Sequence, residues 1–336
     1  MKPIPLVRVN ALLPCVTFLK EIGAPVQRLL AAAKLPVAVC DNPEALIPLH
    51  QGCHFLEQAA RSQGIPQFGL RAGQRVRLEE LGAFGRLICG SLTLYEAITA
   101  ASRLVAAHNT GERIWLKVQG EQAQLCHQYV AGIDCGRQQA DHYVVMCLLQ
   151  LICLCAGTDW RPPAVHFETG PSPGLEQSEP LAGARLAFNQ EATAIFLPRT
   201  LLSLLLKKQV KLPVTPSEAE TDLWASAPAG DFGGSVRQVL GLLLQEGYPD
   251  IGLAAEVAGV SIRTFQRRLA AADLDYSRLV EQVRFEKAMR LLTEPHVKLV
   301  EIAVELGYTE AANFTRAFRR WTGVPPSQFR CQRAAG

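Results

Sequence analysis

The sequence predicts a two-domain protein: an N-terminal α+β domain at residues 1–210, a linker at 211–234 and a C-terminal all-α domain at 235–336. Three observations support this division. The chain of 336 residues is longer than one ordinary domain. The apolar pattern mixes helical and strand periods upstream but stays helical downstream. Between them lies a stretch with three prolines, two adjacent glycines and little periodicity.

The N-terminal part combines helical and strand patterns. Apolar residues at helical spacing predict helices at 16–33, 49–63 and 93–105. Alternation of apolar and polar residues at 113–119 and 124–130, with Gly120 and Glu121 between them, predicts a β-hairpin. The remaining predicted elements are a helix at 141–156, short strands at 164–169 and 194–197, and a closing helix at 198–207.

The C-terminal part is predicted to be helical almost throughout. We expect Ser235 to cap a first helix that ends before Gly247 and Pro249. The further predicted helices span 252–258, 262–272, 276–293, 299–306 and 311–321.

Composition indicates a folded protein in a reducing compartment. Hydrophobic residues make up 49% and charged residues 19%, which favours a large core over disorder. The ten cysteines lack disulfide-framework spacing and no secretory signal opens the chain, so we expect free thiols and a cytoplasmic location. No apolar run reaches the roughly 18 residues of a membrane span. The apolar stretch 144–156 is therefore expected to be a buried helix, and no membrane partner is expected.

Metal and catalytic chemistry find little support. His50, Cys53 and His54 offer possible ligands on one helix, but a further partner at suitable spacing is lacking, so no metal and no cofactor are predicted. The motifs of phosphate-binding loops, dinucleotide folds, serine hydrolases and zinc proteases are absent, so we predict that the chain is not an enzyme. The cysteines of the 141–156 helix are expected to act as small hydrophobes, although a redox-sensing thiol stays open.

An internal repeat marks the C-terminal part. Residues 253–269 (LAAEVAGVSIRTFQRRL) resemble residues 300–318 (VEIAVELGYTEAANFTRAF), and Ala255 and Gly259 have counterparts 48 residues later. A small residue four positions before a glycine lets two short helices cross closely, and the glycine supplies a left-handed turn. Each copy therefore predicts a helix-turn-helix unit.

The second helix of each copy has two faces. Phe265 and Leu269 form an apolar stripe in the first copy, and Phe314, Phe318 and Trp321 form one in the second. The opposite faces carry Arg, Gln, Asn and small side chains, which suit the edges of bases in the major groove.

Charge points in the same direction. From residue 235 onward there are 14 Lys and Arg against 11 Asp and Glu, so the whole net charge of +3 lies in the C-terminal part. An ordinary solvated face would explain one arginine-bearing helix equally well. Two such helices in duplicated units favour binding to double-stranded DNA.

Residues 250–330 resemble the AraC/XylS family of transcriptional regulators. The resemblance lies in SIRTFQRRL (261–269), RFEKAMRLL (284–292), EIAVELGY (301–308) and NFTRAFRRWTGVPP (313–326). It implies a sequence-specific regulator of promoter DNA, expected to be an activator, with RNA polymerase as a further partner. It also implies that the helix at 276–293 spaces the two recognition helices about 34 Å apart, for successive major-groove segments.

The resemblance further implies roles for individual residues. Base contacts are expected from Arg263, Gln266 and Arg267 in the first copy and from Ala311, Ala312, Asn313, Thr315 and Arg316 in the second. Phosphate contacts are expected from Ser261, Thr264, Arg268, Arg319 and Arg320. Two alanines in the second set offer only methyl contacts, so we expect weaker hydrogen-bond recognition there. Arg284 is expected to stabilise the fold.

The N-terminal part resembles the sensing and dimerising domain of the ornithine-utilisation-regulator type of AraC protein. The matching segments are FGLRAG (68–73), LGAFG (81–85), SLTLYEAI (91–98) and RLAF (185–188). The resemblance implies response to a small-molecule effector, formation of a homodimer, or both, and names no effector residue.

Two features of the N-terminal part leave alternatives open. The leucine-rich stretch 197–206 is either a dimer seam or an internal core helix. Polar and aromatic residues near the hairpin either line a pocket or lie scattered at the edge of the core: His108, Arg113, Trp115, Lys117, His127 and Tyr129.

Two other hypotheses concern function. In the first, the DNA-binding module is fused to a reactive-cysteine domain for alkyl transfer or redox sensing. The Pro-Cys-His-Arg context of the alkyl-transfer proteins is absent from this sequence. Alternatively, the N-terminal domain only dimerises or binds a protein partner.

Overall fold

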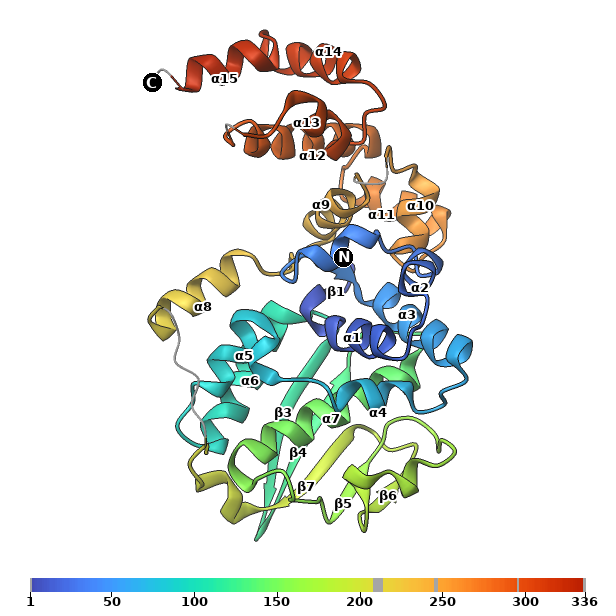
Figure 1. Ribbon diagram of the computed structural model, residues 1–336, viewed down its shortest axis with the longest axis vertical. Helices are drawn as coiled ribbons and strands as arrows, with labels where there is room; N and C mark the ends of the chain where they lie inside the picture. The colour runs from blue at the N-terminus through green and yellow to red at the C-terminus, as the bar shows by residue number, and fades with distance from the viewer. Residues whose placement is uncertain (1, 208–213, 245–246, 295, 335–336) are drawn as a thin grey trace. The chain divides into compact units, whose positions relative to one another are not determined.

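The computed structural model describes residues 2–207, 214–244, 247–294 and 296–334, which form two compact units (Figure 1). The mixed unit spans Pro5–Pro228, and the helical unit consists of Met1–Ile4 with Ala229–Gly336. The predicted division into an α+β part and an all-α part is confirmed.

The position of the boundary differs from the prediction. Much of the predicted linker is helix α8 (Pro216–Ala225), which packs against α5 within the mixed unit. Thr215 caps α8 through a reciprocal pair of hydrogen bonds with Glu218, and a proline at the first helical position is compatible with a helix start. The buried Arg8 side chain donates to the carbonyl oxygen of Leu223 at 3.0 Å. Residues 211–213 of the predicted linker lie outside the described residues.

The mixed unit contains a two-stranded and a five-stranded sheet with helices around them. Its strands and helices are β1 (Leu6–Arg8), α1 (Leu13–Glu21), α2 (Val26–Ala32), β2 (Leu46–Pro48), α3 (Leu49–Gln63), α4 (Phe68–Gly73), α5 (Gly82–Cys89), α6 (Leu94–His108), β3 (Glu112–Gln119), β4 (Gln122–Tyr129), α7 (Arg137–Ala156), β5 (Ala164–His166), β6 (Arg185–Ala187), β7 (Thr193–Pro198) and α8.

The larger sheet has the strand order β3-β4-β7-β5-β6, in which only β5 and β6 are parallel. The predicted hairpin is confirmed as β3 and β4, with Glu112 opposite Tyr129 and Gly120 in a left-handed turn. Helix α7 lies across this sheet (Figure 1) and contacts β7. The fully buried Leu125, Val165 and Ile195 belong to the core of the unit.

Two predicted helices of the mixed unit were wrong in extent or type. The helix at 16–33 is divided into α1 and α2, because Gly23 has a φ of 72° and Pro25 follows it. The segment at 198–207 is not a helix of the predicted length. It continues from β7 into a short 3-10 turn at Arg199–Ser203, and Leu205 then forms a β-bridge with Thr93.

Helix α7 is longer than the apolar stretch suggested. Its 20 residues are long and apolar enough to cross a bilayer by length and composition, yet 72% of the most apolar part is buried inside the protein. The expectation of a buried helix therefore holds. The expectation that no apolar stretch reaches the length of a membrane span does not, because α7 reaches that length.

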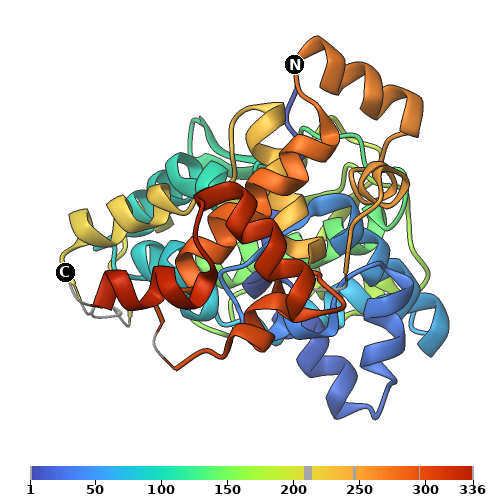
Figure 2. The same cartoon turned by 90° about the horizontal axis from the view of Figure 1, so that it is seen from above.

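The helical unit follows the predicted pattern closely. Its last helices are drawn in red in Figure 2. Its helices are α9 (Phe232–Leu243), α10 (Ile251–Val257), α11 (Ile262–Ala271), α12 (Tyr276–Leu291), α13 (Leu299–Glu305), α14 (Ala311–Thr322) and α15 (Pro326–Ala334). The last of these was missed. Asp231, rather than Ser235, caps α9; Ser235 is buried one turn further on and accepts a hydrogen bond from the amide of Ile4 at 2.9 Å.

Candidate nucleic-acid interface and a buried cavity

Helices α10 and α11 form the first helix-turn-helix unit. Ala255 is fully buried where the two helices meet, and Gly259 has a φ of 68°, which supplies the left-handed turn. Ser261 begins α11 by accepting a hydrogen bond from the amide of Thr264 at 3.2 Å. The sequence therefore predicted this unit for the correct physical reasons.

Helix α11 buries one face and exposes the other. Phe265 and Leu269 are 1% and 3% exposed. The three residues expected to contact bases, Arg263, Gln266 and Arg267, all lie exposed on the opposite side. Among the expected phosphate contacts, Arg268 is half-buried with its guanidinium 5.9 Å from the Phe232 ring centre.

Helices α13 and α14 form the second unit around an equivalent turn. Gly307 has a φ of 71°, and a Cβ at this position would lie 2.5 Å from the carbonyl oxygen of Gly247. Phe314 and Phe318 are fully buried in a cluster with Ile302 and other residues of α12 and α13. The aromatic stripe of α14 therefore attaches it to the rest of the unit.

The outer face of α14 carries the second set of expected DNA contacts. Ala312, Arg316, Arg319 and Arg320 are exposed, whereas Ala311, Asn313 and Thr315 are half-buried. Three side chains already have partners within the protein: Arg316 donates to Asn313 Oδ1, Thr315 donates to the carbonyl oxygen of Ala311, and Arg320 pairs with Glu281 of α12.

These internal partners bear on the expected roles. Arg316 and Asn313, predicted separately, are brought together as one hydrogen-bonded pair. The ion pair of Arg320 with Glu281 is exposed and therefore weak, about 0–1 kcal/mol, so a phosphate would compete for this arginine with little loss. The hydroxyl groups of Ser261 and Thr264 lie 3.0 Å apart at the start of α11.

Arg284 of α12 fixes the turn of the second unit. It is 8% exposed, and its guanidinium donates to the carbonyl oxygens of Leu306 and Gly307, each at 2.9 Å. The same group lies 4.1 Å from the Tyr308 ring centre and 5.1 Å from that of Tyr248. These contacts give a physical basis for the expected role of Arg284 in stabilising the fold. The two flanking tyrosines were missed, because nothing local in the sequence connects residue 248 with residue 308.

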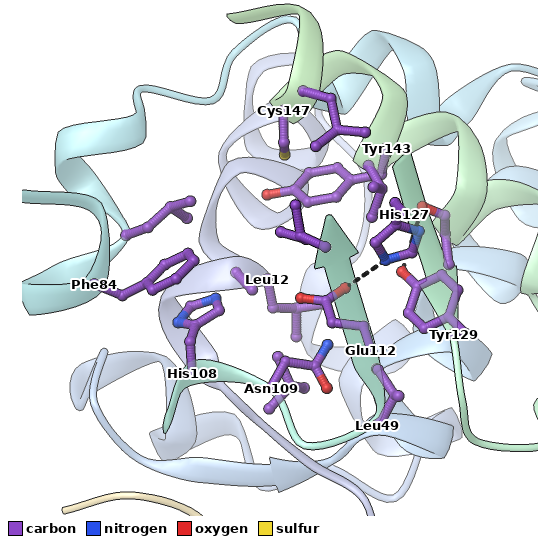
Figure 3. A pocket seen from close by; sticks show the side chains of 18 of the residues that line it. Leu12, Leu49, Phe84, His108, Asn109, Glu112, His127, Tyr129, Tyr143 and Cys147 are labelled. Carbon is purple, nitrogen blue, oxygen red and sulfur yellow. Dashed lines mark hydrogen bonds and ion pairs between the residues drawn. The ribbon is translucent and has the colours of Figure 1, made fainter. Parts of the chain in front are cut away.

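A cavity lies inside the mixed unit, between the helices and the first two strands of the larger sheet (Figure 3). The cavity has a volume of about 120 Å³. Most of the lining is aliphatic or aromatic and comes from α1, α3, α5, α6 and α7. Among the residues that the structure describes, no group of three His, Cys, Asp or Glu side chains could hold a metal ion.

Several polar side chains of this cavity lie on or beside β3 and β4, whereas Tyr143 comes from α7 and its hydroxyl group is buried without a hydrogen-bond partner. Glu112 Oε2 accepts a hydrogen bond from His127 Nε2 at 2.9 Å (Figure 3). His108 stacks on Phe84 with ring centres 4.5 Å apart, and burial lowers its pKa to about 4, so the ring is neutral near pH 7. The Nδ1 atoms of both histidines are buried without a hydrogen-bond partner.

The sequence identified only part of this cavity. Of the six residues considered near the hairpin, His108, His127 and Tyr129 line it. Arg113, Trp115 and Lys117 do not; the two cations lie over the Trp115 ring, at 4.6 and 5.8 Å from its centre. Glu112 and Tyr143 were missed.

Comparison with known proteins agrees with this geometry. Residues 23–206 match the model of the arabinose-binding domain of AraC transcription regulators, and residues 254–332 match a helix-turn-helix domain model. The chain belongs to the AraC family of transcription regulators. The match at 254–332 includes α11 and α14, so this AraC-family chain is a DNA-binding transcription regulator.

Curated relatives of this AraC-family chain extend along its whole length. The ornithine utilization regulator of Pseudomonas aeruginosa is 26% identical over 332 residues, covering 97% of this chain and 96% of that protein. The transcriptional regulator VirS of Mycobacterium tuberculosis is 25% identical over 340 residues, with the same coverage. A crystal structure of the regulator CdpR from Pseudomonas aeruginosa covers 91% of this chain and 96% of its own, at 19% identity and a TM-score of 0.39.

Proposed function

We propose that this regulator activates transcription by placing α11 and α14 in successive major-groove segments of promoter DNA. The observation that carries the proposal is that each helix buries its apolar stripe and leaves its arginine face exposed. Two relatives that match over 98 and 79 residues, CfaD and CsvR of Escherichia coli, are named HTH-type transcriptional activators, which supports the sign of regulation.

The side chains of α11 suit hydrogen-bond recognition of bases. Arg263 and Arg267 each present a planar fork that fits O6 and N7 of guanine, and Gln266 has the donor and acceptor that fit adenine. Arg268, together with Ser261 and Thr264 at the helix start, would contact phosphates.

The side chains of α14 suit a different mode. Ala311 and Ala312 would contact thymine methyl groups, while the Asn313–Arg316 pair, with Thr315 beside it, would supply the polar base contacts. Arg319 and Arg320, near the end of the helix, would contact phosphates and contribute a salt-dependent affinity that does not depend on sequence.

The mixed unit supplies the proposed control. We assign the cavity of Figure 3 as the site of a small-molecule effector, because it combines a largely apolar lining with unpartnered buried nitrogens. The active form would be a cytoplasmic homodimer that also contacts RNA polymerase.

Mobility-shift titrations with matched and scrambled promoter DNA test the DNA-binding part. Arg267→Ala and Arg316→Ala should each cost about 1–3 kcal/mol on matched DNA and relax the preference at one base pair. Arg320→Ala should weaken binding to both DNAs alike.

Arg290→Ala is the matched control, because it removes one exposed arginine from α12 outside both recognition helices. If Arg267→Ala and Arg316→Ala behave like Arg290→Ala on both DNAs, the assigned faces do not contact bases.

A further inference from the structure

We propose that the cavity of the mixed unit takes a small, largely apolar molecule with a hydrogen-bond-donating end, such as a primary alkylamine, and discriminates against sugars and carboxylates. The inference rests on the effector control proposed above and specifies the chemistry of that same site. It follows from the size of the cavity, the scarcity of polar groups in its lining and the sign of the charge there.

The size of the cavity limits the occupant. Its volume of about 120 Å³ is close to that of an engineered protein cavity of ~150 Å³ that binds benzene. An occupant of roughly six to eight non-hydrogen atoms therefore fits without a large rearrangement. Leu12, Leu49, Val144 and Leu148 are among the side chains that would surround its apolar part.

The scarcity of polar partners disfavours a sugar. A pentose such as arabinose carries a hydroxyl group on nearly every carbon, and each hydroxyl buried without a partner costs about 1–3 kcal/mol. Apart from Tyr143 and the cysteine thiols, few polar side chains line the cavity, and Glu112 and His127 are already hydrogen-bonded to each other. Asn109 Oδ1, for example, accepts a hydrogen bond from the amide of Gly111 at 2.9 Å.

The sign of the charge favours a donor over a carboxylate. Glu112 is the only Asp, Glu, Lys or Arg among the residues found to line the cavity. The nearby Arg8 is engaged with Glu44 and with carbonyl oxygens, and Arg137 is paired with Glu168. A bound carboxylate would therefore face a like charge without a cation to receive it.

The hydrogen-bonding state of Glu112 and His127 completes the preference. An ionised carboxylate only accepts hydrogen bonds, so His127 Nε2 carries the proton of their shared bond. His127 Nδ1 is buried without a hydrogen-bond partner, and in the tautomer that carries its proton on Nε2 this atom is an acceptor. An ammonium group brings three donors to this end of the cavity, and a hydroxyl group brings one.

Calorimetric titration of the full chain near pH 7 with hexylamine, 1-hexanol, hexanoate and arabinose tests the proposal. Hexylamine should bind at least tenfold more tightly than hexanoate, with 1-hexanol between them and arabinose weakest. Glu112→Gln, which keeps the shape and removes the charge, should reduce hexylamine affinity about tenfold. Glu121→Gln is the matched control, because Glu121 lies exposed in the hairpin turn and does not line this cavity; it should leave hexylamine affinity unchanged.

Three outcomes would overturn the proposal: tighter binding of hexanoate or arabinose than of hexylamine, equal hexylamine affinity with and without the Glu112 charge, or no binding of any probe. Mobility shifts on the same samples separate this from the proposed function. Intact DNA recognition with no probe bound rejects the cavity ligand alone, and tighter binding of arabinose or hexanoate than of hexylamine rejects only its chemical class.

Discussion

Replacing Arg284 should loosen the second helix-turn-helix unit while leaving the first intact. Arg284→Ala removes two charge-assisted hydrogen bonds to the carbonyl oxygens of Leu306 and Gly307. It also removes the cation between the rings of Tyr248 and Tyr308. None of these groups belongs to α10 or α11, so the effect should be confined to the turn and the helices beside it.

The size of the effect follows from the contacts that are lost. A hydrogen bond to a charged group contributes about 1.5–3 kcal/mol. A cation over an aromatic ring contributes about 0.5–2 kcal/mol. Because the contacts share one side chain and are not additive, we expect a local loss of about 3–4 kcal/mol. At 1.4 kcal/mol per factor of ten, this corresponds to a several-hundredfold change in the local opening equilibrium.

Amide hydrogen exchange of the full chain, followed by mass spectrometry, measures this opening directly. Peptides within 299–322 should exchange at least a hundredfold faster in Arg284→Ala, whereas peptides within 251–271 should be unchanged. Arg284→Lys keeps the charge but loses the planar fork, so its effect should be intermediate. Unchanged exchange in 299–322 would refute the reasoning, and so would equal acceleration in both regions.

Three further predictions concern separate features. Gly307→Ala should destabilise the helical unit by about 2 kcal/mol or more in urea unfolding, because residue 307 has a positive φ and the added Cβ would lie 2.5 and 2.8 Å from two carbonyl oxygens. A cost below about 0.5 kcal/mol would contradict the close packing. His142 is fully buried with both ring nitrogens unpartnered, and burial lowers its pKa to about 4. The unfolded chain therefore binds more protons between pH 6.5 and 4, so stability falls as the pH falls through this range, and His142→Leu should flatten that dependence in unfolding measured at several pH values. Iodoacetamide should alkylate the exposed Cys331 within minutes and leave Cys15, buried with its pKa raised by burial, unmodified in the folded chain; peptide mapping that found Cys15 labelled first would contradict the described burial.

The elements set by local patterns could be predicted from the sequence. The predicted helices of the helical unit, which do not include α15, agree with the observed bounds to within a few residues, because apolar periodicity and the glycines at 259 and 307 act locally. The hairpin was found for the same reason. The stretch at 198–207 misled because leucine favours helices, whereas here Leu205 is held by a bridge to a residue more than a hundred positions away.

The cavity shows why the rest could not be predicted. Glu112 and His127 meet because the β3–β4 register places Glu112 opposite Tyr129, two residues beyond His127. Tyr143 and Cys147 join them from α7, whose position against the sheet depends on long-range packing. The sequence showed that polar residues accompany the hairpin, but not which of them share an enclosed space.

The turn at Gly307 also limits how such a chain can diversify. Its backbone fits closely against the carbonyl oxygens of Leu244 and Gly247, which precede the first helix-turn-helix unit. The two helix-turn-helix units therefore cannot be exchanged independently of the residues that contact them. A hybrid regulator that took its second half from another member would need the donor's counterparts of Leu244, Gly247, Tyr248 and Arg284 as well. A new operator specificity is therefore reached more readily by exchanging side chains on α14 than by grafting the whole half.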